Sequence, residues 1–283
     1  MHRFYRLSVL ALALGGAAAC SPEKVVETED IPTAGIRFIN AVPDTFGFDF
    51  RPVDIVENSV FYGVNFRTTL QIFYKNARAG NRHFRIFFTN PGLGLPHAEQ
   101  QAIASTVVED LQLNLEAGKR YTVILWGYMR PGSTPAKQVT VLTDDPADPG
   151  SQVALRVINA AAGLGALDVR QYPDGGTVPA AATWANVPEM TASSYVNTGT
   201  DRIRYNVRLA GSATNLITAD ALAPVGIAET IDIDAIPGTT LAGTAVSGII
   251  FPRSVSGSNA TNFTTPGIFF MWDRRPPRTC ALC

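Results

Sequence analysis

The residue types that most often carry catalysis or bind metals are sparse and scattered in this sequence. The histidines are His2, His83 and His97, and no two of them stand at a metal-ligand spacing. No Gly-x-Ser-x-Gly elbow, His-Glu-x-x-His motif or glycine-rich phosphate loop occurs. The sequence therefore predicts no catalytic residue, no metal site and no cofactor, and we expect a protein that is not an enzyme.

Two groups of carboxylates remain as candidates for ion binding. Asp144, Asp145 and Asp148 form a cluster that could offer several oxygen ligands to Ca²⁺, and Asp232 and Asp234 would share one face of a strand. Neither spacing matches an EF-hand loop. We expect instead a solvated linker between two domains and an exposed strand face.

Basic side chains gather on two hairpins at matched places in the chain. They are Lys75, Arg78, Arg82, His83 and Arg85 in the first hairpin, and Arg202, Arg204 and Arg208 in the second. A repeated basic face could contact anionic glycans or lipid head groups. The favoured interpretation is that these cations keep a wet sheet face soluble and its edges unpaired.

The clearest pattern in the chain is a stretch that occurs twice. Residues 37–51 and 156–170 align without a gap at a constant offset of 119, with Arg, Ile, Asn, Ala, Asp and Arg identical at matched places. The two halves of the chain are therefore expected to fold alike. Outside the stretch, the expected matches are 64–66 with 185–187, Tyr74 with Tyr195, 84–88 with 205–209, Gly118 with Gly238, Gly127 with Gly248, and the run before Asp144 with the last strand at 269–273.

The polar residues kept in both copies of the stretch are expected to be structural. Asp49 and Asp168 occupy matched places, but no second carboxylate recurs with them, as an acid/base pair would require. Asn40 and Asn159 are expected to satisfy the backbone of a turn.

Short strands separated by turn residues predict an all-β protein. Hydrophobic content of 46% and charged content of 17% suit a packed globular chain, and 24 Gly and 19 Pro supply many turns. In the first half, strands are expected at 36–42, 47–51, 60–66, 70–75, 82–88, 111–115, 120–127 and 139–143. Residues 91–110 are expected to hold a loop or one helical turn. Without an amphipathic helix of any length, antiparallel β-sandwiches are the predicted architecture.

The N-terminus has the composition of an export signal. Arg3 and Arg6 precede a short apolar run and a series of small residues that ends at Cys20. This pattern resembles a bacterial lipoprotein signal, in which the cysteine is lipidated and becomes the first residue. It departs from the usual pattern at Ala17, where that family has Leu, and 17–19 is also an acceptable A-x-A site for simple secretion. By the same resemblance, Ser21 after the cysteine implies sorting to the outer membrane.

The cysteine count agrees with a lipid anchor. If Cys20 carries lipid, Cys280 and Cys283 remain as a possible disulfide pair in an oxidising compartment, with free thiols or a bond to another chain as alternatives. Residues 21–34 are polar and acid-rich, as a flexible tether would be. The formal net charge of −1 does not suggest a nucleic-acid partner.

The repeated stretch and a later run resemble a known family. The Arg-x-Ile-Asn-Ala start, the strand that follows it, and Leu-Glu-Ala-Gly-Lys-Arg-Tyr-Thr-Val at 115–123 are similar to the domain-of-unknown-function family numbered 4397. The resemblance covers roughly 35–143 and 153–273. It implies tandem, immunoglobulin-like modules in bacterial envelope proteins and supplies no catalytic residues.

Together these observations predict a division of the chain and a class of function. The expected parts are a signal peptide at 1–20, a tether at 21–34, β-sandwich repeats at 35–143 and 153–273, a linker at 144–152, and a C-terminal tail at 274–283. We expect a lipid-anchored cell-envelope protein, in the periplasm or on the cell surface, that binds an unknown protein or glycan or has a surface-structural role. The first alternative is an accessory subunit of an envelope assembly or substrate-capture complex, and the second is a secreted enzyme of unrecognised type. Simple secretion without an anchor is the alternative location.

Overall fold

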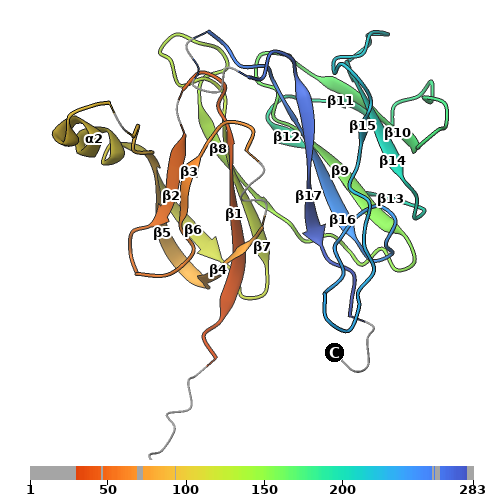
Figure 1. Cartoon of the computed structure of the whole chain (residues 1–283), viewed down its shortest axis with the longest axis horizontal. Coiled ribbons are helices and arrows are strands. Elements are labelled where there is room, and N and C mark those ends of the chain that lie inside the picture. The colour runs from red at the N-terminus through yellow and green to blue at the C-terminus, as the bar shows by residue number, and fades with distance from the viewer. Residues whose placement is uncertain are drawn as a thin grey trace, which may run out of the picture. The chain divides into compact units, whose positions relative to one another are not determined.

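The computed structural model describes residues 30–278 except 46, 69–72, 93, 257 and 259–261. The chain divides into Met1–Pro32 and Thr33–Cys283, and every strand and helix described belongs to the second of these units. Apart from one short helix the regular elements are strands, so the all-β prediction is confirmed (Figure 1). No helix of the described part has the length and apolar character that a membrane span needs.

The first repeat consists of two four-stranded sheets. Its elements are β1 (Thr33–Ala41), β2 (Phe48–Pro52), β3 (Phe61–Val64), β4 (Lys75–Arg78), β5 (Gly80–Phe88), α2 (His97–Ala104), β6 (Val107–Leu115), β7 (Arg120–Trp126) and β8 (Gln138–Thr143). The strand orders are β4-β1-β7-β8 in the inner sheet and β3-β2-β5-β6 in the outer sheet.

The second repeat has the same plan. Its strands are β9 (Val153–Asn159), β10 (Leu167–Pro173), β11 (Trp184–Val187), β12 (Thr191–Ala192), β13 (Val196–Thr198), β14 (Ile203–Leu209), β15 (Ala221–Leu222), β16 (Ala245–Phe251) and β17 (Gly267–Arg274). The inner sheet is β12-β9-β16-β17 with β13 also on β9, and the outer sheet is β11-β10-β14-β15. The sheets are antiparallel except for one parallel pair in each repeat, β1 with β7 and β9 with β16. The intervening strands supply the long crossover that a parallel pair requires.

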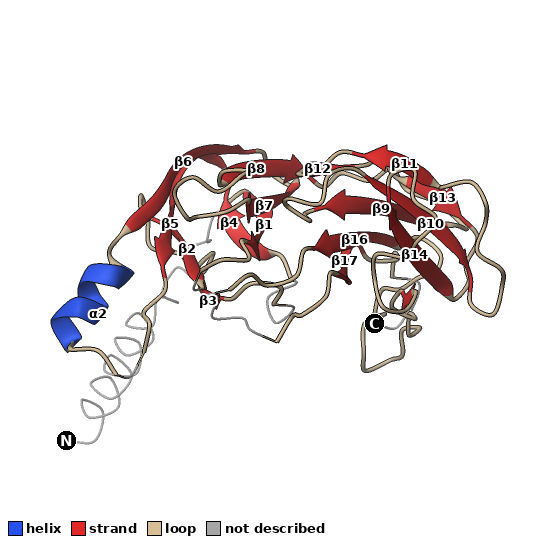
Figure 2. Ribbon diagram, turned by 90° about the horizontal axis from the view of Figure 1, so that it is seen from above, coloured by secondary structure: helices blue, strands red, loops and turns tan. Residues whose placement is uncertain are grey.

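The four sheets form successive layers, which Figure 2 shows from above. One apolar core lies between the sheets of the first repeat, where Phe38, Phe50 and Phe84 stack with ring centroids 4.8–5.1 Å apart. A second core lies between the sheets of the second repeat. A third cluster joins the two inner sheets and includes Ile39, Trp126 and Met271. We call this contact between the inner sheets the seam.

The seam explains why the repeated stretch has no clean alternation of apolar and polar residues. In β1, Ile36 and Phe38 face the core of their own repeat, whereas Arg37 and Ile39 face the seam. Strands β9 and β16 are buried along their whole length. A strand covered on both faces has no wet side, so its sequence cannot show the two-residue period of a half-exposed strand.

Two predictions about local structure need adjustment. Residues 97–104 form a helix of two turns, because Ala, Glu and Gln follow Pro96 and all three favour helix. The strand predicted at 70–75 instead begins at Lys75 and runs to Arg78, while 69–72 lie outside the described residues.

The sheet register also corrects three of the matches between repeats. Gly243, not Gly238, is the counterpart of Gly118. Gly118 and Gly243 both have φ of 77°. Gly118 donates its N–H to the carbonyl of Thr33, at the start of β1, and Gly243 donates its N–H to the carbonyl of Gln152, just before β9. Gly248 lies in the middle of β16 and therefore does not match Gly127, which follows β7. The matches of Tyr74 with Tyr195 and of 84–88 with 205–209 agree with the structure.

The third correction explains the aspartate of the repeated stretch. Gly63 and Asn186 are equivalent, since each has positive φ and donates its N–H to Oδ1 of Asp49 or Asp168 at 2.8 Å. Asn65 had been matched with Asn186. Glycine and asparagine are the residues that tolerate the left-handed backbone at least cost. The aspartate thus fixes a left-handed backbone position in β3 or β11. At this position two successive residues of the strand have no partner on β2 or β10, as in a β-bulge.

Candidate functional site: the seam and its pocket

The centre of the seam contains four charged side chains that are removed from water. Arg37 and Asp144 come from the first repeat, and Arg156 and Asp273 come from the second. The arginines lie on the central strands β1 and β9, and the aspartates follow β8 or lie near the end of β17. Two positive and two negative charges balance, as burial of ions requires.

Each arginine pairs with the aspartate of the other repeat. Arg37 donates from Nη2 to Oδ1 of Asp273 at 2.5 Å, and Arg156 donates from Nη2 to Oδ1 of Asp144. The distances from each arginine to the aspartate of its own repeat are longer, 3.6 Å in both cases. The pairs therefore cross the seam in both directions, which is the arrangement of a two-fold, self-complementary interface.

The remaining hydrogen bonds of these groups repeat the same symmetry. Arg37 donates from Nε to the hydroxyl of Thr122 at 2.7 Å, and Arg156 does so to Ser247 at 2.6 Å. These hydroxyls donate in turn to the aspartate of their own repeat, Asp144 or Asp273. Sequence matching had not related Thr122 to Ser247.

Two tyrosines complete the group. The hydroxyl of Tyr74 donates to Asp144 and that of Tyr195 donates to Asp273, both at 2.8 Å. The guanidinium groups lie over the rings, Arg37 at 4.5 Å from the centroid of Tyr74 and Arg156 at 4.7 Å from that of Tyr195. We call the eight side chains the seam network: Arg37, Tyr74, Thr122, Asp144, Arg156, Tyr195, Ser247 and Asp273.

The charges of the network keep one another ionised. Burial alone would raise the pKa of Asp273, but Arg156, Arg37 and the Ser247 hydroxyl together hold this pKa below its ordinary value. Burial would lower the pKa of Arg37, but Tyr74, Asp273 and Asp144 raise it instead. The pKa of Tyr74 is raised, chiefly by burial. Asp273 and Arg37 therefore keep their charges across the physiological range, and their ion pair joins the two repeats.

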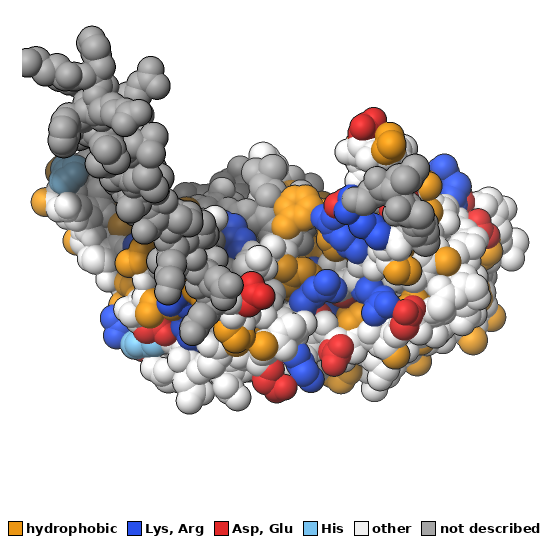
Figure 3. Space-filling model, turned by 90° about the horizontal axis from the view of Figure 1, so that it is seen from below, with side chains coloured by type: hydrophobic (Ala, Val, Ile, Leu, Met, Phe, Trp, Pro, Cys, Tyr) orange, Lys and Arg blue, Asp and Glu red, His pale blue; other side chains and the backbone are white. Residues whose placement is uncertain are grey.

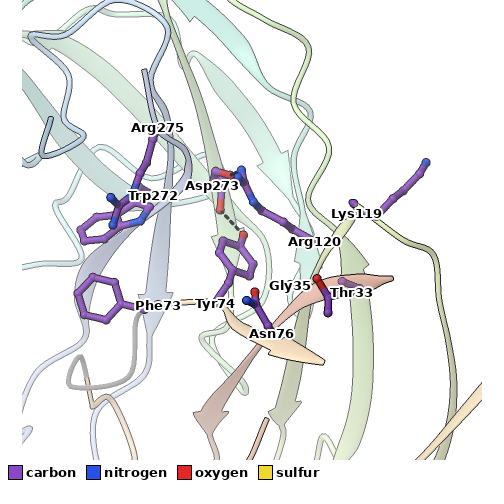
Figure 4. Close-up of a pocket in the computed structure, with 12 residues that line it drawn as sticks. Thr33, Gly35, Phe73, Tyr74, Asn76, Lys119, Arg120, Trp272, Asp273 and Arg275 are labelled. Carbon is purple, nitrogen blue, oxygen red and sulfur yellow. Dashed lines mark hydrogen bonds between the residues drawn. The ribbon is translucent and has the colours of Figure 1, made fainter. Parts of the chain in front are cut away.

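A pocket of about 320 Å³ opens at one edge of the seam network. Residues from both repeats line it: Thr33, Ala34, Gly35, Phe73, Tyr74, Asn76, Gly118, Lys119, Arg120, Trp272, Asp273 and Arg275. Figure 4 shows Phe73 and Trp272 together on one side, Lys119 on the other, and Tyr74 and Asp273 between them. The Nη1 of Arg120 donates to the main-chain oxygen of Asp273 at 2.8 Å, so this guanidinium spans the two repeats. We call this cavity the seam pocket.

The three aspartates considered as a candidate calcium cluster lie in two different environments. Asp144 is 3% exposed and belongs to the seam network, so its prediction as part of a solvated linker is wrong. The side chain of Asp145 is 71% exposed, and Asp148 pairs with Arg274 at 2.6 Å. The described residues hold no group of three His, Cys, Asp or Glu able to bind a metal. Asp232 and Asp234 lie in an exposed turn instead of the expected strand.

The basic hairpins are largely neutralised by acids. Arg82 is buried and binds Asp54 and Glu57 at 2.8–3.0 Å, while His83 and Arg85 bind Asp110. The Arg82 guanidinium, through its hydrogen bonds, holds the pKa of Asp54 well below its usual range. In the second repeat Arg202 and Arg204 share Asp174, and Arg208 binds Asn206. Lys75 donates to the main-chain oxygen of Val60, and among the described residues the side chains of Lys75, Arg78 and Arg208 have no acid partner, so five of the eight basic side chains are compensated.

The asparagines of the repeated stretch have the predicted structural role. The side-chain oxygen of Asn40 accepts from the N–H of Val42 at 3.0 Å, and that of Asn159 accepts from Ala161 at 3.1 Å. Each side-chain amide also donates across to the strand β3 or β11. The lipidation candidate Cys20 and the possible disulfide partners Cys280 and Cys283 lie outside the described residues.

A family model described as "Domain of unknown function (DUF4397)" matches residues 34–170. Residues 34–170 belong to the DUF4397 family. The match begins in β1 and ends in β10 at Arg170, so it covers the first repeat and the opening stretch of the second. A search of curated proteins found no significant match. Five members of the seam network lie within the DUF4397 segment, namely Arg37, Tyr74, Thr122, Asp144 and Arg156.

Proposed function

We propose that this chain is a non-enzymatic binding module of the bacterial cell envelope, anchored by a lipid on Cys20. The observation that carries the binding role is the seam pocket, which two repeats build together and which the seam network holds in one geometry. A rigid, preformed pocket reduces the entropy lost when a ligand binds.

The polar groups of the pocket favour binding over catalysis. Asp273 is the single carboxylate among its lining residues, and that group is buried and already bonded to Arg37, Tyr195 and Ser247. A general acid or base must reach the reacting proton, and a nucleophile needs a base beside it. Among the described lining residues there is no histidine, serine or cysteine to fill those roles, while Tyr74 already donates to Asp144 and Lys119 lies beside Asp145.

The envelope location is supported by the leader pattern at 1–20 and by the cysteine at its end. The direct test is fractionation of cells that express the wild-type chain, Cys20→Ser, or the control Cys283→Ser. We expect wild type and the control in the membrane fraction and Cys20→Ser in the soluble fraction. Membrane association of Cys20→Ser equal to that of wild type would contradict the lipid anchor.

Sorting to the outer membrane can be tested with one neighbouring residue. In a sucrose gradient the wild-type protein is expected with the outer membrane, and Ser21→Asp is expected to move to the inner membrane. Recovery of both proteins in the inner membrane would contradict an outer-membrane location and leave the anchor itself intact.

An accessory subunit of an envelope complex is the second candidate, favoured by one surface loop. Residues 225–236 expose Val225, Ile227, Ile231, Ile233 and Ile236. Clustered exposed apolar side chains are typical of protein contacts. Affinity capture with the wild-type chain and with Ile231→Asp/Ile233→Asp would separate the two candidates, since a stoichiometric partner lost only in the double variant indicates a subunit.

A further inference from the structure

Three cations and one carboxylate line the seam pocket, namely Lys119, Arg120, Arg275 and Asp273. Arg120 has no carboxylate partner among the described residues, and its contacts are the carbonyl of Asp273 and the ring of Tyr74. Lys119 lies 3.6 Å from the exposed carboxylate of Asp145 and 3.9 Å from that of Glu116, and Arg275 lies 3.9 Å from that of Asp234. Such exposed pairs are weak and exchange readily with a competing anion. Seen from below, basic side chains gather near the middle of the molecule beside hydrophobic ones (Figure 3).

Aromatic side chains form the other half of the pocket. Phe73 and Trp272 meet edge to face, with ring centroids 4.9 Å apart, and the guanidinium of Arg275 lies 5.8 Å from the Trp272 ring. Phe73 is 49% exposed, so its ring is accessible from the pocket. In Figure 4 the two rings stand across the pocket from Lys119.

The opposite edge of the seam lacks these groups. By the register of the inner sheets, β1 Gly35 pairs with Arg120, whereas β9 Ala154 pairs with Ala245. The equivalent of Arg120 is therefore Ala245, and the equivalent of Lys119 is the buried Thr244. Both repeats contribute matched residues to the seam network, whereas Lys119 and Arg120 of the first repeat have uncharged equivalents in the second. This asymmetry separates the pocket from the symmetric structure that holds the seam.

From these observations we infer that the seam pocket binds a carboxylate carried on a six-membered ring. The planar guanidinium of Arg120 matches the geometry of a carboxylate, and Lys119 adds a second donor. Phe73 and Trp272 offer an apolar surface to the face of the ring. A volume of about 320 Å³ lies in the range of small-molecule sites. Two sources share this chemistry, an acidic sugar of the uronate class and an aromatic carboxylate.

The test is calorimetric titration of the purified Cys20→Ser full chain with glucuronate and with benzoate, and with glucose and benzamide as uncharged counterparts. We expect saturable binding of at least one of the two anions and none of the neutral compounds. Binding of glucuronate alone assigns the acidic sugar, and binding of benzoate alone assigns the aromatic acid. Absence of saturable binding for both anions would overturn the inference.

Variants locate the binding in the pocket. Arg120→Gln is expected to weaken the binding of the anion about 10- to 100-fold, the range for a lost hydrogen bond to a charged group. The control Arg85→Gln removes an exposed cation on the outer sheet and should leave the affinity unchanged. Phe73→Ala should also weaken the binding of the anion. Because Phe73 lies outside the regular strands, this variant replaces Arg120→Gln in the test if Arg120→Gln does not fold. Equal affinity in wild type and in the folded pocket variants would overturn the assignment.

This inference rests on the proposed binding role, and its failure can be told apart from failure of the envelope location. The titration uses a chain without the lipid anchor, so its outcome does not depend on Cys20. Fractionation of Cys20→Ser in turn does not depend on the pocket. Loss of anion binding with normal membrane anchoring would leave an envelope protein with a structural or subunit role.

Discussion

Asp144 offers the sharpest test of the seam network because its neighbour in the chain is a natural control. Asp144 accepts hydrogen bonds from Arg156, Thr122 and Tyr74, whereas the side chain of Asp145 is 71% exposed and its one ion pair among the described residues is with Lys119, at 3.6 Å. Asp144→Ala removes the buried partner of Arg156 and leaves that cation with Ser247 and with Asp273 at 3.6 Å.

The expected cost follows from the burial of the pair. Loss of one partner from a buried ion pair destabilises a protein by about 3–5 kcal/mol, because the other charge stays desolvated. For a folded unit of this size, each kcal/mol lowers the melting temperature by about 2–4 °C, so Asp144→Ala should lower it by about 6–20 °C. Asp145→Ala should change the free energy of unfolding by less than about 0.5 kcal/mol.

The assay is denaturant unfolding of the soluble chain, followed by tryptophan fluorescence, for wild type and both variants. A double variant, Arg156→Met/Asp144→Leu, removes both charges and is expected to recover much of the lost free energy of unfolding. If Asp144→Ala and Asp145→Ala lie within about 1 kcal/mol of each other, the seam network does not stabilise the fold as described.

Two further predictions concern acid and the outer sheet. Because the folded-state pKa of Asp273 lies below its unfolded value, the stability that this group contributes is present above about pH 4 and is lost as pH falls through the folded pKa. The free energy of unfolding should therefore depend less on acid pH in Asp273→Asn than in wild type. An equal dependence in both proteins would contradict this prediction. On β5, Arg82→Ala should lower the free energy of unfolding by about 2–3 kcal/mol, because it leaves Asp54 and Glu57 without their cation. Arg85→Ala, at an exposed site, should lower the free energy of unfolding by less than about 0.5 kcal/mol. Equal melting temperatures for these two variants would refute the distinction.

The sequence was informative where interactions are local. Asn40 acts on Val42, two residues away, and Asp49 acts on Gly63, fourteen residues away, and both roles were predicted as structural. Short strands and turn residues likewise predicted the all-β fold. Patterns of this kind depend on residue propensity and spacing, which a single sequence contains.

The site could not be predicted from the same information, because its contacts join distant parts of the chain. Arg37 meets Asp273 across 236 residues, and Asp144 stands in a run of prolines and aspartates that is typical of an exposed linker. The signal that could have found the network was the repeat itself. Arg37 recurs as Arg156, and an aspartate stands near the end of the last strand of each repeat or just after it, so the two types were available for pairing in both copies.

The matching of residues between the two repeats could not be completed from the sequence for another reason. The segments between the matched strands differ in length, so one offset cannot serve the whole chain. The counterpart of Gly118 is Gly243, although Gly238 lies closer to the offset of the opening stretch. Only the hydrogen bonds of paired strands restore the correct match.

We expect the crossed ion pairs to make the two repeats one cooperative unit of unfolding. Differential scanning calorimetry of the Cys20→Ser chain tests it most directly, through the calorimetric and van't Hoff enthalpies of unfolding. A single transition in which the two enthalpies agree is the predicted result for the intact seam network. Two resolved transitions, each with about half of the total enthalpy, would show that the repeats unfold independently and that the seam network does not couple them.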